Sequence, residues 1–154
     1  MRTLVDIRSV PRSRRNPQFE QASLSPTLAA AGVEYVHLPE LGGLRHPRRD
    51  SPNTGWRNAS FRGYADYMLT EDFQAGLDKL LGLASERGPV AIMCAEAVPW
   101  RCHRSLVADA LVARGLEVRH IVGHGPLTAH RVTPMAHIAG TVVTYPGDQP
   151  RQLA

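Results

Sequence analysis

Short apolar runs and longer amphipathic stretches alternate along the chain, and their periods predict its secondary structure. The run from Val90 to Met93 is apolar at every position, which is typical of a strand covered on both faces. Residues 33–38 instead alternate apolar and polar side chains, as a strand does when one face is buried. Strands are predicted at residues 3–7, 33–38, 90–94 and 117–122, with one further short strand at 141–145.

Helical patterns fill most of the intervals between these strands. The clearest one begins at Thr70, a residue suited to capping a helix N-terminus, has two acids in its first turn and ends before Gly88 and Pro89. Gly32 and Gly115 are expected to end two others. Helices are predicted at residues 18–31, 60–68, 70–87 and 103–114.

Strands separated by helices pair in parallel through right-handed crossovers. The order of elements therefore predicts an α/β fold, a three-layer sandwich with a mostly parallel sheet of four to five strands. The length of 154 residues suits a single domain, so we expect one α/β domain over residues 1–154.

In parallel α/β sheets, ligands bind outside the carboxyl ends of the strands. The residues at or just past the ends of the predicted strands carry polar or small side chains, which indicates one shared pocket. They are Arg8 and Ser9, His37 and Glu40, Cys94 and Glu96, and Gly123 and His124. Residues 39–58 contain glycines and prolines that exclude regular structure, and loops of this length are usually functional or disordered.

Charge and composition narrow the class of partner. The formal net charge is +4, and Lys79 is the only lysine, so almost all the positive charge is guanidinium, which grips phosphate or carboxylate in a bidentate manner. A surface charge run is often only a solvated face, but two arginine clusters in converging loops would attract anions. The clusters are Arg8, Arg12, Arg14 and Arg15, and Arg45, Arg48 and Arg49.

No window of the sequence is apolar enough for a membrane span, and the N-terminal residues read as a strand instead of a secretory signal. We therefore expect a cytoplasmic protein without a membrane partner. In that compartment the two cysteines are expected to be thiols.

Residues 89–104 concentrate the candidate chemistry between a strand and a helix start, a place suited to holding anions. Candidate catalytic residues are Cys94 and Cys102 as nucleophile or redox thiol, and Glu96 and His103 as acid and base. Candidate binding residues are Arg8, Arg101 and Arg104 as anion grips, His37 and Glu40 at a strand end, and Trp56 and Tyr64 as a pocket wall.

Structural roles compete with each assignment. Cys94 at the end of a buried strand fits an inert small hydrophobe, Glu96 fits an ion-pair partner, and Tyr64 fits a core contact of a short helix. Zinc is a further alternative, with Cys94, Cys102, His103 and His37 as ligands, but their spacing matches no usual zinc pattern. We therefore expect no metal and no cofactor.

The chain closely resembles the bacterial family known as domain of unknown function 488, over about residues 3–125, with residues 126–154 as a C-terminal extension. The motifs that carry the resemblance are Val5-Asp-Ile-Arg8 with Pro11 and Pro17, His37-Leu-Pro-Glu-Leu-Gly-Gly43, Phe61-Arg-Gly-Tyr-Ala-Asp-Tyr-Met68, Met93-Cys-Ala-Glu96 and Cys102-His-Arg104. The resemblance implies a small α/β fold with its site at the Cys-Ala-Glu and Cys-His-Arg segments. It implies no particular reaction.

Two function hypotheses remain. The first is an enzyme, a hydrolase or transferase, acting on a small anionic substrate that bears a phosphate or resembles a nucleotide. The second is a nucleic-acid or nucleotide binding module built on the arginine loops, without catalysis, whose affinity falls steeply with salt.

Overall fold

The computed structural model describes residues 2–96 and 101–147. Its elements group into two compact units. The first unit comprises Met1–Gly43 and Glu71–Ala95, and the second comprises Leu44–Thr70 and Glu96–Ala154. The expectation of one domain over residues 1–154 stays a prediction.

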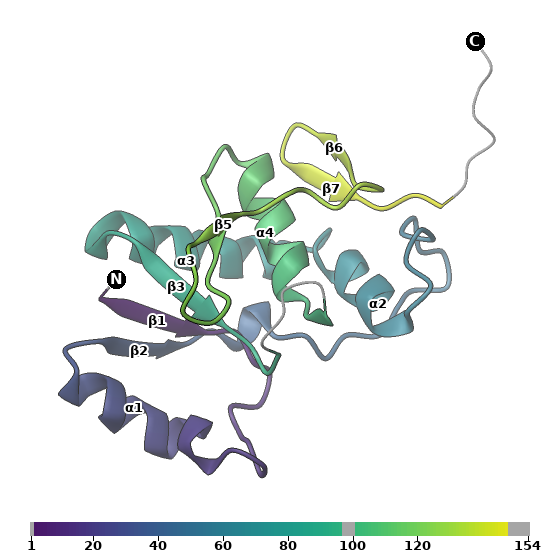
Figure 1. The fold of residues 1–154 in the computed structure, drawn as a ribbon. Helices are drawn as coiled ribbons and strands as arrows, with labels where there is room; N and C mark the ends of the chain where they lie inside the picture. The colour runs from purple at the N-terminus through teal and green to yellow at the C-terminus, as the bar shows by residue number, and fades with distance from the viewer. Residues whose placement is uncertain (1, 97–100, 148–154) are drawn as a thin grey trace. The chain divides into compact units, whose positions relative to one another are not determined.

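The first unit is built on a parallel sheet of three short strands, β1 (Thr3–Asp6), β2 (Glu34–His37) and β3 (Val90–Met93), in the order β2-β1-β3 (Figure 1). Asp6 at the end of β1 lies level with His37 on one side and with Met93 on the other. Because all three strands end together, the residues that follow them meet at one edge of the sheet.

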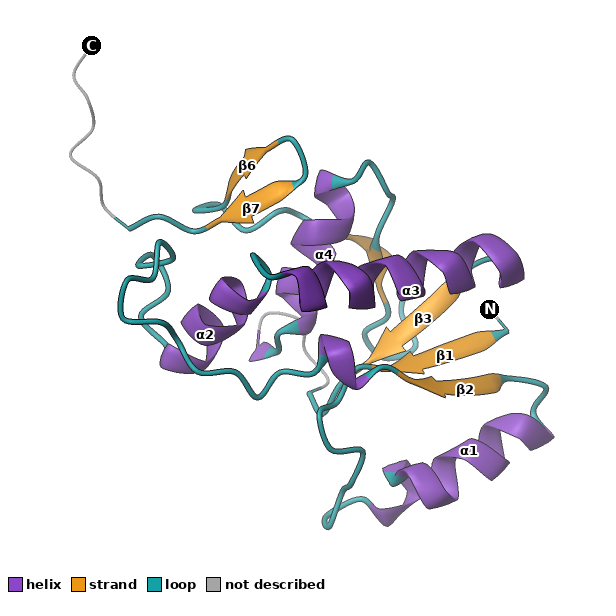
Figure 2. Cartoon of the chain, turned by 180° about the vertical axis from the view of Figure 1, so that it is seen from behind, coloured by secondary structure: helices purple, strands orange, loops and turns teal. Residues whose placement is uncertain are grey.

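Two helices flank this sheet. Helix α1 (Gln21–Ala30) and helix α3 (Glu71–Arg87) lie on opposite sides of the three strands (Figure 2). Short 3-10 turns precede α1 and follow β2, at η1 (Pro17–Phe19) and η2 (Pro39–Leu41). The α/β class and the positions of these three strands and two α-helices confirm the prediction from the sequence, whereas the turns η1 and η2 were not predicted. The buried apolar side chains of this unit include Val5, Ile7, Leu24, Leu38, Leu41, Phe73, Leu77 and Leu80.

The second unit contains helices α2 (Ala59–Tyr67) and α4 (Arg104–Ala113) and two small antiparallel pairs. Strand β4 (Arg119–His120) pairs with β5 (Thr128–Ala129), and β6 (His137–Ala139) pairs with β7 (Val142–Thr144). Helix α2 starts where it does because the Asn58 side chain accepts hydrogen bonds from the backbone N–H groups of Ser60 and Phe61.

The prediction of a fourth parallel strand at residues 117–122 is wrong. In the described part of the chain the parallel sheet has three strands, and only Arg119–His120 of this segment is extended and paired, in the antiparallel sense. Gly123, at a φ of 65°, turns the chain back toward β5, so this segment forms a hairpin instead of a crossover. The predicted strand at 141–145 is present as β7, also in a hairpin.

A buried carboxylate organises the irregular loop that precedes α2. Asp66 on α2 accepts hydrogen bonds from the Arg48 backbone N–H at 2.8 Å, the Ser51 hydroxyl at 2.6 Å and the Asn53 amide at 2.7 Å. Asn53 in turn accepts the Tyr145 backbone N–H at 2.8 Å. Glycines and prolines exclude regular structure here, and side-chain hydrogen bonds supply the order instead.

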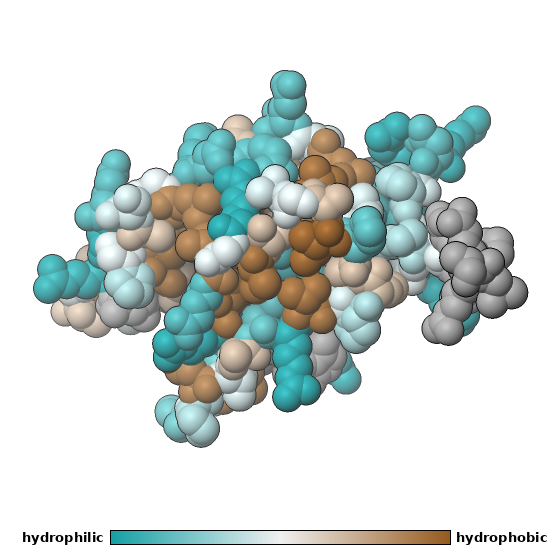
Figure 3. Space-filling model, turned by 90° about the horizontal axis from the view of Figure 1, so that it is seen from above, coloured by the Kyte–Doolittle hydropathy of each residue, from teal (hydrophilic) through white to brown (hydrophobic). Residues whose placement is uncertain are grey.

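The surface of the second unit carries several exposed apolar side chains. They include Leu116, Ile121, Val122, Leu127, Ile138 and Val142. Figure 3 shows one face of the molecule, where hydrophobic side chains reach the surface between hydrophilic ones. Among the described residues, no helix is long and apolar enough to span a membrane.

Removing the Asp66 carboxylate should destabilise the second unit. Asp66→Ala leaves the buried Asn53 amide and two partly buried donors without their acceptor, and we expect it to lower the free energy of unfolding by about 3 kcal/mol. The matched control is Asp50→Ala, whose exposed ion pair with Arg48 at 2.9 Å should be worth about 0.5 kcal/mol or less. Urea denaturation of the two variants checks this, and equal losses would contradict the role of Asp66.

Candidate functional site

The strand order has a topological switch point at β1. The chain passes from β1 to β2 on one side of β1 and then crosses back to β3 on its other side. The connections to the two neighbours of β1 therefore run in opposite directions, and in open α/β sheets ligands bind at the carboxyl edge of such a point. Arg8 follows β1 at this edge, and Cys94 follows β3.

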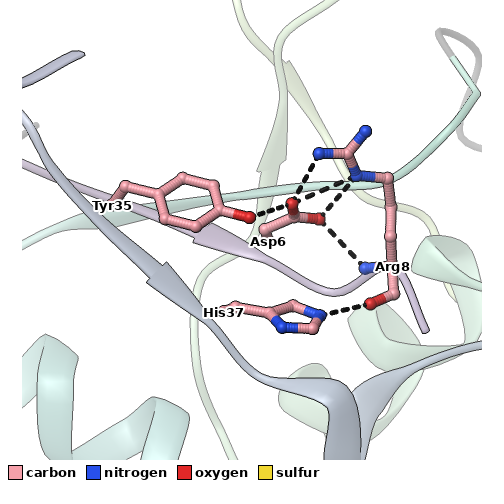
Figure 4. Close-up of polar contacts among 4 residues, drawn as sticks. All are labelled: Asp6, Arg8, Tyr35 and His37. Carbon is pink, nitrogen blue, oxygen red and sulfur yellow. Dashed lines mark hydrogen bonds and ion pairs between the residues drawn. The ribbon is translucent and has the colours of Figure 1, made fainter. Parts of the chain in front are cut away.

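A buried ion pair occupies the end of β1 (Figure 4). The Arg8 guanidinium donates from Nε to Asp6 Oδ1 at 2.9 Å and from Nη2 to Asp6 Oδ2 at 2.7 Å. The backbone N–H of Arg8 donates to the same carboxylate at 3.0 Å. The exposed fractions of the two side chains are 0% for Asp6 and 6% for Arg8. A fork of donors on one carboxylate fixes the direction in which the chain leaves the strand.

Tyr35 on β2 completes the coordination of this carboxylate by donating its hydroxyl hydrogen to Asp6 Oδ2. Burial raises the pKa of Asp6, but the hydrogen bonds from Arg8 and Tyr35 outweigh it, so the pKa lies below its ordinary value. Burial and the adjacent Asp6 charge raise the pKa of Tyr35. The group therefore stays a carboxylate, a guanidinium and a neutral phenol at neutral pH.

His37 at the end of β2 is oriented by the backbone of Arg8. Its Nε2 lies 2.7 Å from the Arg8 carbonyl oxygen (Figure 4). A carbonyl can only accept, so Nε2 carries the hydrogen, and neutral His37 keeps its lone pair on Nδ1. His37 is half-buried, and within the described residues its Nδ1 makes no hydrogen bond. This is the arrangement of a base that is held at one nitrogen and available at the other.

Glu40 does not join this cluster. It lies in η2, and its carboxylate receives the Lys79 ammonium of α3 at 2.8 Å. The hydrogen bond from Lys79 holds the pKa of Glu40 below its ordinary value. Glu40 therefore helps to attach η2 to α3.

Arg8 also begins a strongly basic segment, residues 8–16, which we call the arginine loop. It contains four arginines and no acid. Arg12, Arg14 and Arg15 are exposed, and in the described part of the chain they make no ion pair. The Arg8 charge is compensated by Asp6, so the uncompensated positive charge at this edge belongs to the other three.

In the second unit, several predicted site residues gather at the start of α4. The Cys102 sulfur lies 3.6 Å from His103 Nδ1 and accepts the Arg104 backbone N–H at 3.3 Å. The Tyr64 ring lies 4.8 Å from the His103 ring, and burial raises the pKa of Tyr64. Burial also lowers the pKa of Arg104.

Three further predicted residues belong to this unit. Trp56 packs against Phe61 and Tyr145, with ring centroids 5.0 and 5.5 Å away, so it belongs to an aromatic cluster of the core. Glu96 and Arg101 are exposed.

The expectation of free thiols is corrected. The structure has no free cysteine, and both Cys94 and Cys102 are disulfide-bonded. A sulfur in a disulfide is neither a thiolate nor a nucleophile until it is reduced. Both side chains are also buried.

The sequence reasoning missed two residues of the first cluster, Asp6 and Tyr35. Asp6 had a detectable signal, because a lone charge at the end of an otherwise apolar strand needs a partner in the core. Tyr35 had none, since its contact with Asp6 depends on the register between two strands. Among the described residues, no three His, Cys, Asp or Glu side chains gather as metal ligands would.

The fold and this edge together define a class, an α/β protein whose three parallel strands end at a buried Asp–Arg pair, with a half-buried Tyr beside it, next to a basic loop. The chain belongs to the family described as domain of unknown function DUF488, whose model matches residues 1–111. The match contains the three strands and most of α4, and it ends before β4. Among curated proteins and among solved structures, no match was found.

Neutralising Asp6 should destabilise the protein in a pH-dependent way. Asp6→Asn leaves the Arg8 charge buried without its partner, which we expect to cost about 3–5 kcal/mol of unfolding free energy at pH 7. The folded-state pKa of Asp6 is depressed, so the contribution of its carboxylate is complete above the unfolded-state value of about 3.9 and is lost as the pH falls through the folded-state pKa.

The difference between the wild type and Asp6→Asn should therefore shrink below about pH 4, as urea denaturation between pH 7 and 2 can measure. Glu117→Gln is the control, because its pair with Arg119 at 2.8 Å is exposed. A difference that stays constant down to pH 2 would show that the Asp6 charge is not what stabilises the fold.

Proposed function

We propose that the protein is an enzyme that binds a small anionic substrate, phosphate-bearing or nucleotide-like, at the carboxyl edge of β1, β2 and β3. The observation that carries the proposal is the arginine loop, four arginines without an acid, which starts at the carboxyl end of the central strand. Guanidinium groups bind phosphate oxygens with paired N–H donors. The reversal in the direction of the connections at β1 supports the same location.

The arginines of the loop have two different roles in this proposal. Arg12, Arg14 and Arg15 are exposed and bind the anion. Arg8 is a positioning residue, because two of its guanidinium nitrogens are held by Asp6 and its charge is compensated there. Its own carbonyl then orients His37.

His37 is the proposed general base. Its Nε2–H is committed to the Arg8 carbonyl, so Nδ1 is the nitrogen that accepts a proton from the attacking water or hydroxyl. A general base beside anion-binding arginines at one sheet edge suits hydrolysis of a phosphate-bearing substrate or transfer of a group from it. A cysteine nucleophile, at Cys94 or Cys102, would be an alternative only after the disulfide is reduced.

A test of the anion site compares two triple variants that remove the same charge. In Arg12→Ala/Arg14→Ala/Arg15→Ala we expect the affinity for pyrophosphate and for nucleoside triphosphates, measured by titration calorimetry, to fall at least about tenfold. The control is Arg2→Ala/Arg87→Ala/Arg119→Ala. Arg2 and Arg87 precede strands at the amino edge, and Arg119 lies in the second unit, so this variant should keep its affinity within about twofold.

Equal losses in the two triple variants would mean that only the net charge matters, and the proposed site would be abandoned. Tight, strongly salt-dependent binding of single-stranded DNA or RNA without any binding of nucleotides would favour the binding-module hypothesis instead.

A second test isolates the base. In His37→Gln the side-chain amide can still donate to the Arg8 carbonyl, but the ring Nδ1 is gone. We expect phosphate release from a panel of nucleotides to fall about 10²–10⁴-fold, while nucleotide affinity and urea stability stay near wild-type values. A variant that keeps its turnover would remove His37 from the mechanism and leave the anion site standing.

A further inference from the structure

The second unit contains a cluster of titratable side chains that the proposed function does not use. Its centre is Asp109 on α4, which is fully buried. Asp109 Oδ1 lies 2.7 Å from His130 Nε2 and accepts the Thr133 backbone N–H at 3.1 Å. Asp109 Oδ2 accepts the Tyr145 hydroxyl at 2.7 Å. The carboxylate thus joins segments that follow β5 and β7 to α4.

A second histidine extends this cluster toward the surface. His130 Nδ1 lies 2.7 Å from Nε2 of His120 on β4, and the two rings meet edge to face at 74°. The exposed fraction of the His130 side chain is 5%, whereas His120 is half-buried. The order Asp109, His130, His120 therefore leads from a buried charge to a partly accessible ring.

With both rings neutral, the hydrogen-bond pattern fixes their tautomers. The carboxylate of Asp109 only accepts, so His130 carries its hydrogen on Nε2. Neutral His130 then accepts at Nδ1, which requires that His120 donates from Nε2. The lone pair of His120 is consequently on Nδ1, the nitrogen outside the chain of hydrogen bonds. Among the described residues this Nδ1 makes no hydrogen bond and is not one of the buried side-chain nitrogens that lack a partner, and the ring as a whole is half-buried.

We propose that Asp109, His130 and His120 form a proton relay, and that His120 Nδ1 is the general base of a second site, within the second unit, that takes an anionic ligand. When a substrate X–H gives its proton to Nδ1, the hydrogen on His120 Nε2 passes to His130 Nδ1. His120 is again neutral, the positive charge rests on His130 beside the Asp109 carboxylate, and X⁻ remains in the site. One proton has moved into the relay and no other reactant is needed.

The charges around His120 support both parts of this proposal. Burial lowers the pKa of His120, and the neighbouring His130 and Arg104 lower it further, so the ring is an unprotonated base at neutral pH. Arg104 is close enough to act on His120, and its guanidinium would favour a ligand or product that carries negative charge. His120 touches the ligand, while His130 and Asp109 are positioning residues.

The first experiment determines the tautomers in the full-length protein by long-range ¹H–¹⁵N spectra of the imidazole rings at pH 7. Hydrogen on Nε2 of both His120 and His130 is expected. Hydrogen on His120 Nδ1 would overturn the proposal, because no base would then face solvent.

The second experiment measures acylation of His120 by diethyl pyrocarbonate, which reacts with accessible unprotonated imidazole nitrogen. In Asp109→Asn the amide no longer dictates the His130 tautomer, and we expect the rate at His120 to fall at least about tenfold and its pH profile to shift. Tyr145→Phe removes a hydrogen bond to the other carboxylate oxygen but leaves the relay intact, so its rate should stay within about threefold of wild type. His137→Gln, which changes a histidine on exposed β6, should have no effect.

Inorganic phosphate serves as the anionic probe. It should slow the acylation of His120 in a saturable way, and Arg104→Gln should weaken this protection about tenfold. Loss of protection in the wild type, or an unchanged acylation rate in Asp109→Asn, would each overturn the proposal. The Arg12→Ala/Arg14→Ala/Arg15→Ala variant should give wild-type results here, so the two proposed sites are tested separately.

Discussion

The arrangement at the carboxyl edge depends on the burial of the Asp6 carboxylate at the end of the central strand. Removing an ion from water costs several kcal/mol, and this cost is recovered only when every lone pair has a donor. Asp6 has the Arg8 guanidinium, the Arg8 backbone N–H and the Tyr35 hydroxyl. Because Asp6 needs these donors, it holds the Arg8 side chain and backbone in place. The Arg8 carbonyl in turn orients the His37 ring, so one charge at the strand end positions both the start of the basic loop and the candidate base.

The second unit is also ordered by buried carboxylates that accept several hydrogen bonds. Asp66 accepts hydrogen bonds from the irregular loop before α2, and Asp109 accepts hydrogen bonds from the segments that follow β5 and β7. In both cases the surrounding chain has little regular secondary structure, so a multiply hydrogen-bonded carboxylate replaces the backbone ladders that a helix or sheet would supply. Three buried acids thus order the parts of the chain that hydrophobic periodicity does not.

Hydrophobic periodicity predicts what depends on local sequence. The three parallel strands and the helices α1 to α4 follow from apolar runs, caps and glycine stops, because these signals lie within the element itself. The hairpin of β4 and β5 could not be predicted, since its two-residue strands carry no period and its direction depends on a turn at Gly123. The same distinction applies to the candidate site residues. Arg8 and His37 could be predicted because they lie at strand ends, whereas Tyr35, His130 and Tyr145 could not, because their roles depend on tertiary contacts.

The most direct test of the central claim is to map bound pyrophosphate on the full-length, isotopically labelled protein by ¹H–¹⁵N correlation spectra. The account predicts saturable shifts that include the backbone amides of residues 8–16 and the ring of His37, and that the Arg12→Ala/Arg14→Ala/Arg15→Ala variant loses them. Saturable shifts that leave residues 8–16 and His37 unmoved, or no saturable shift at all, would contradict it.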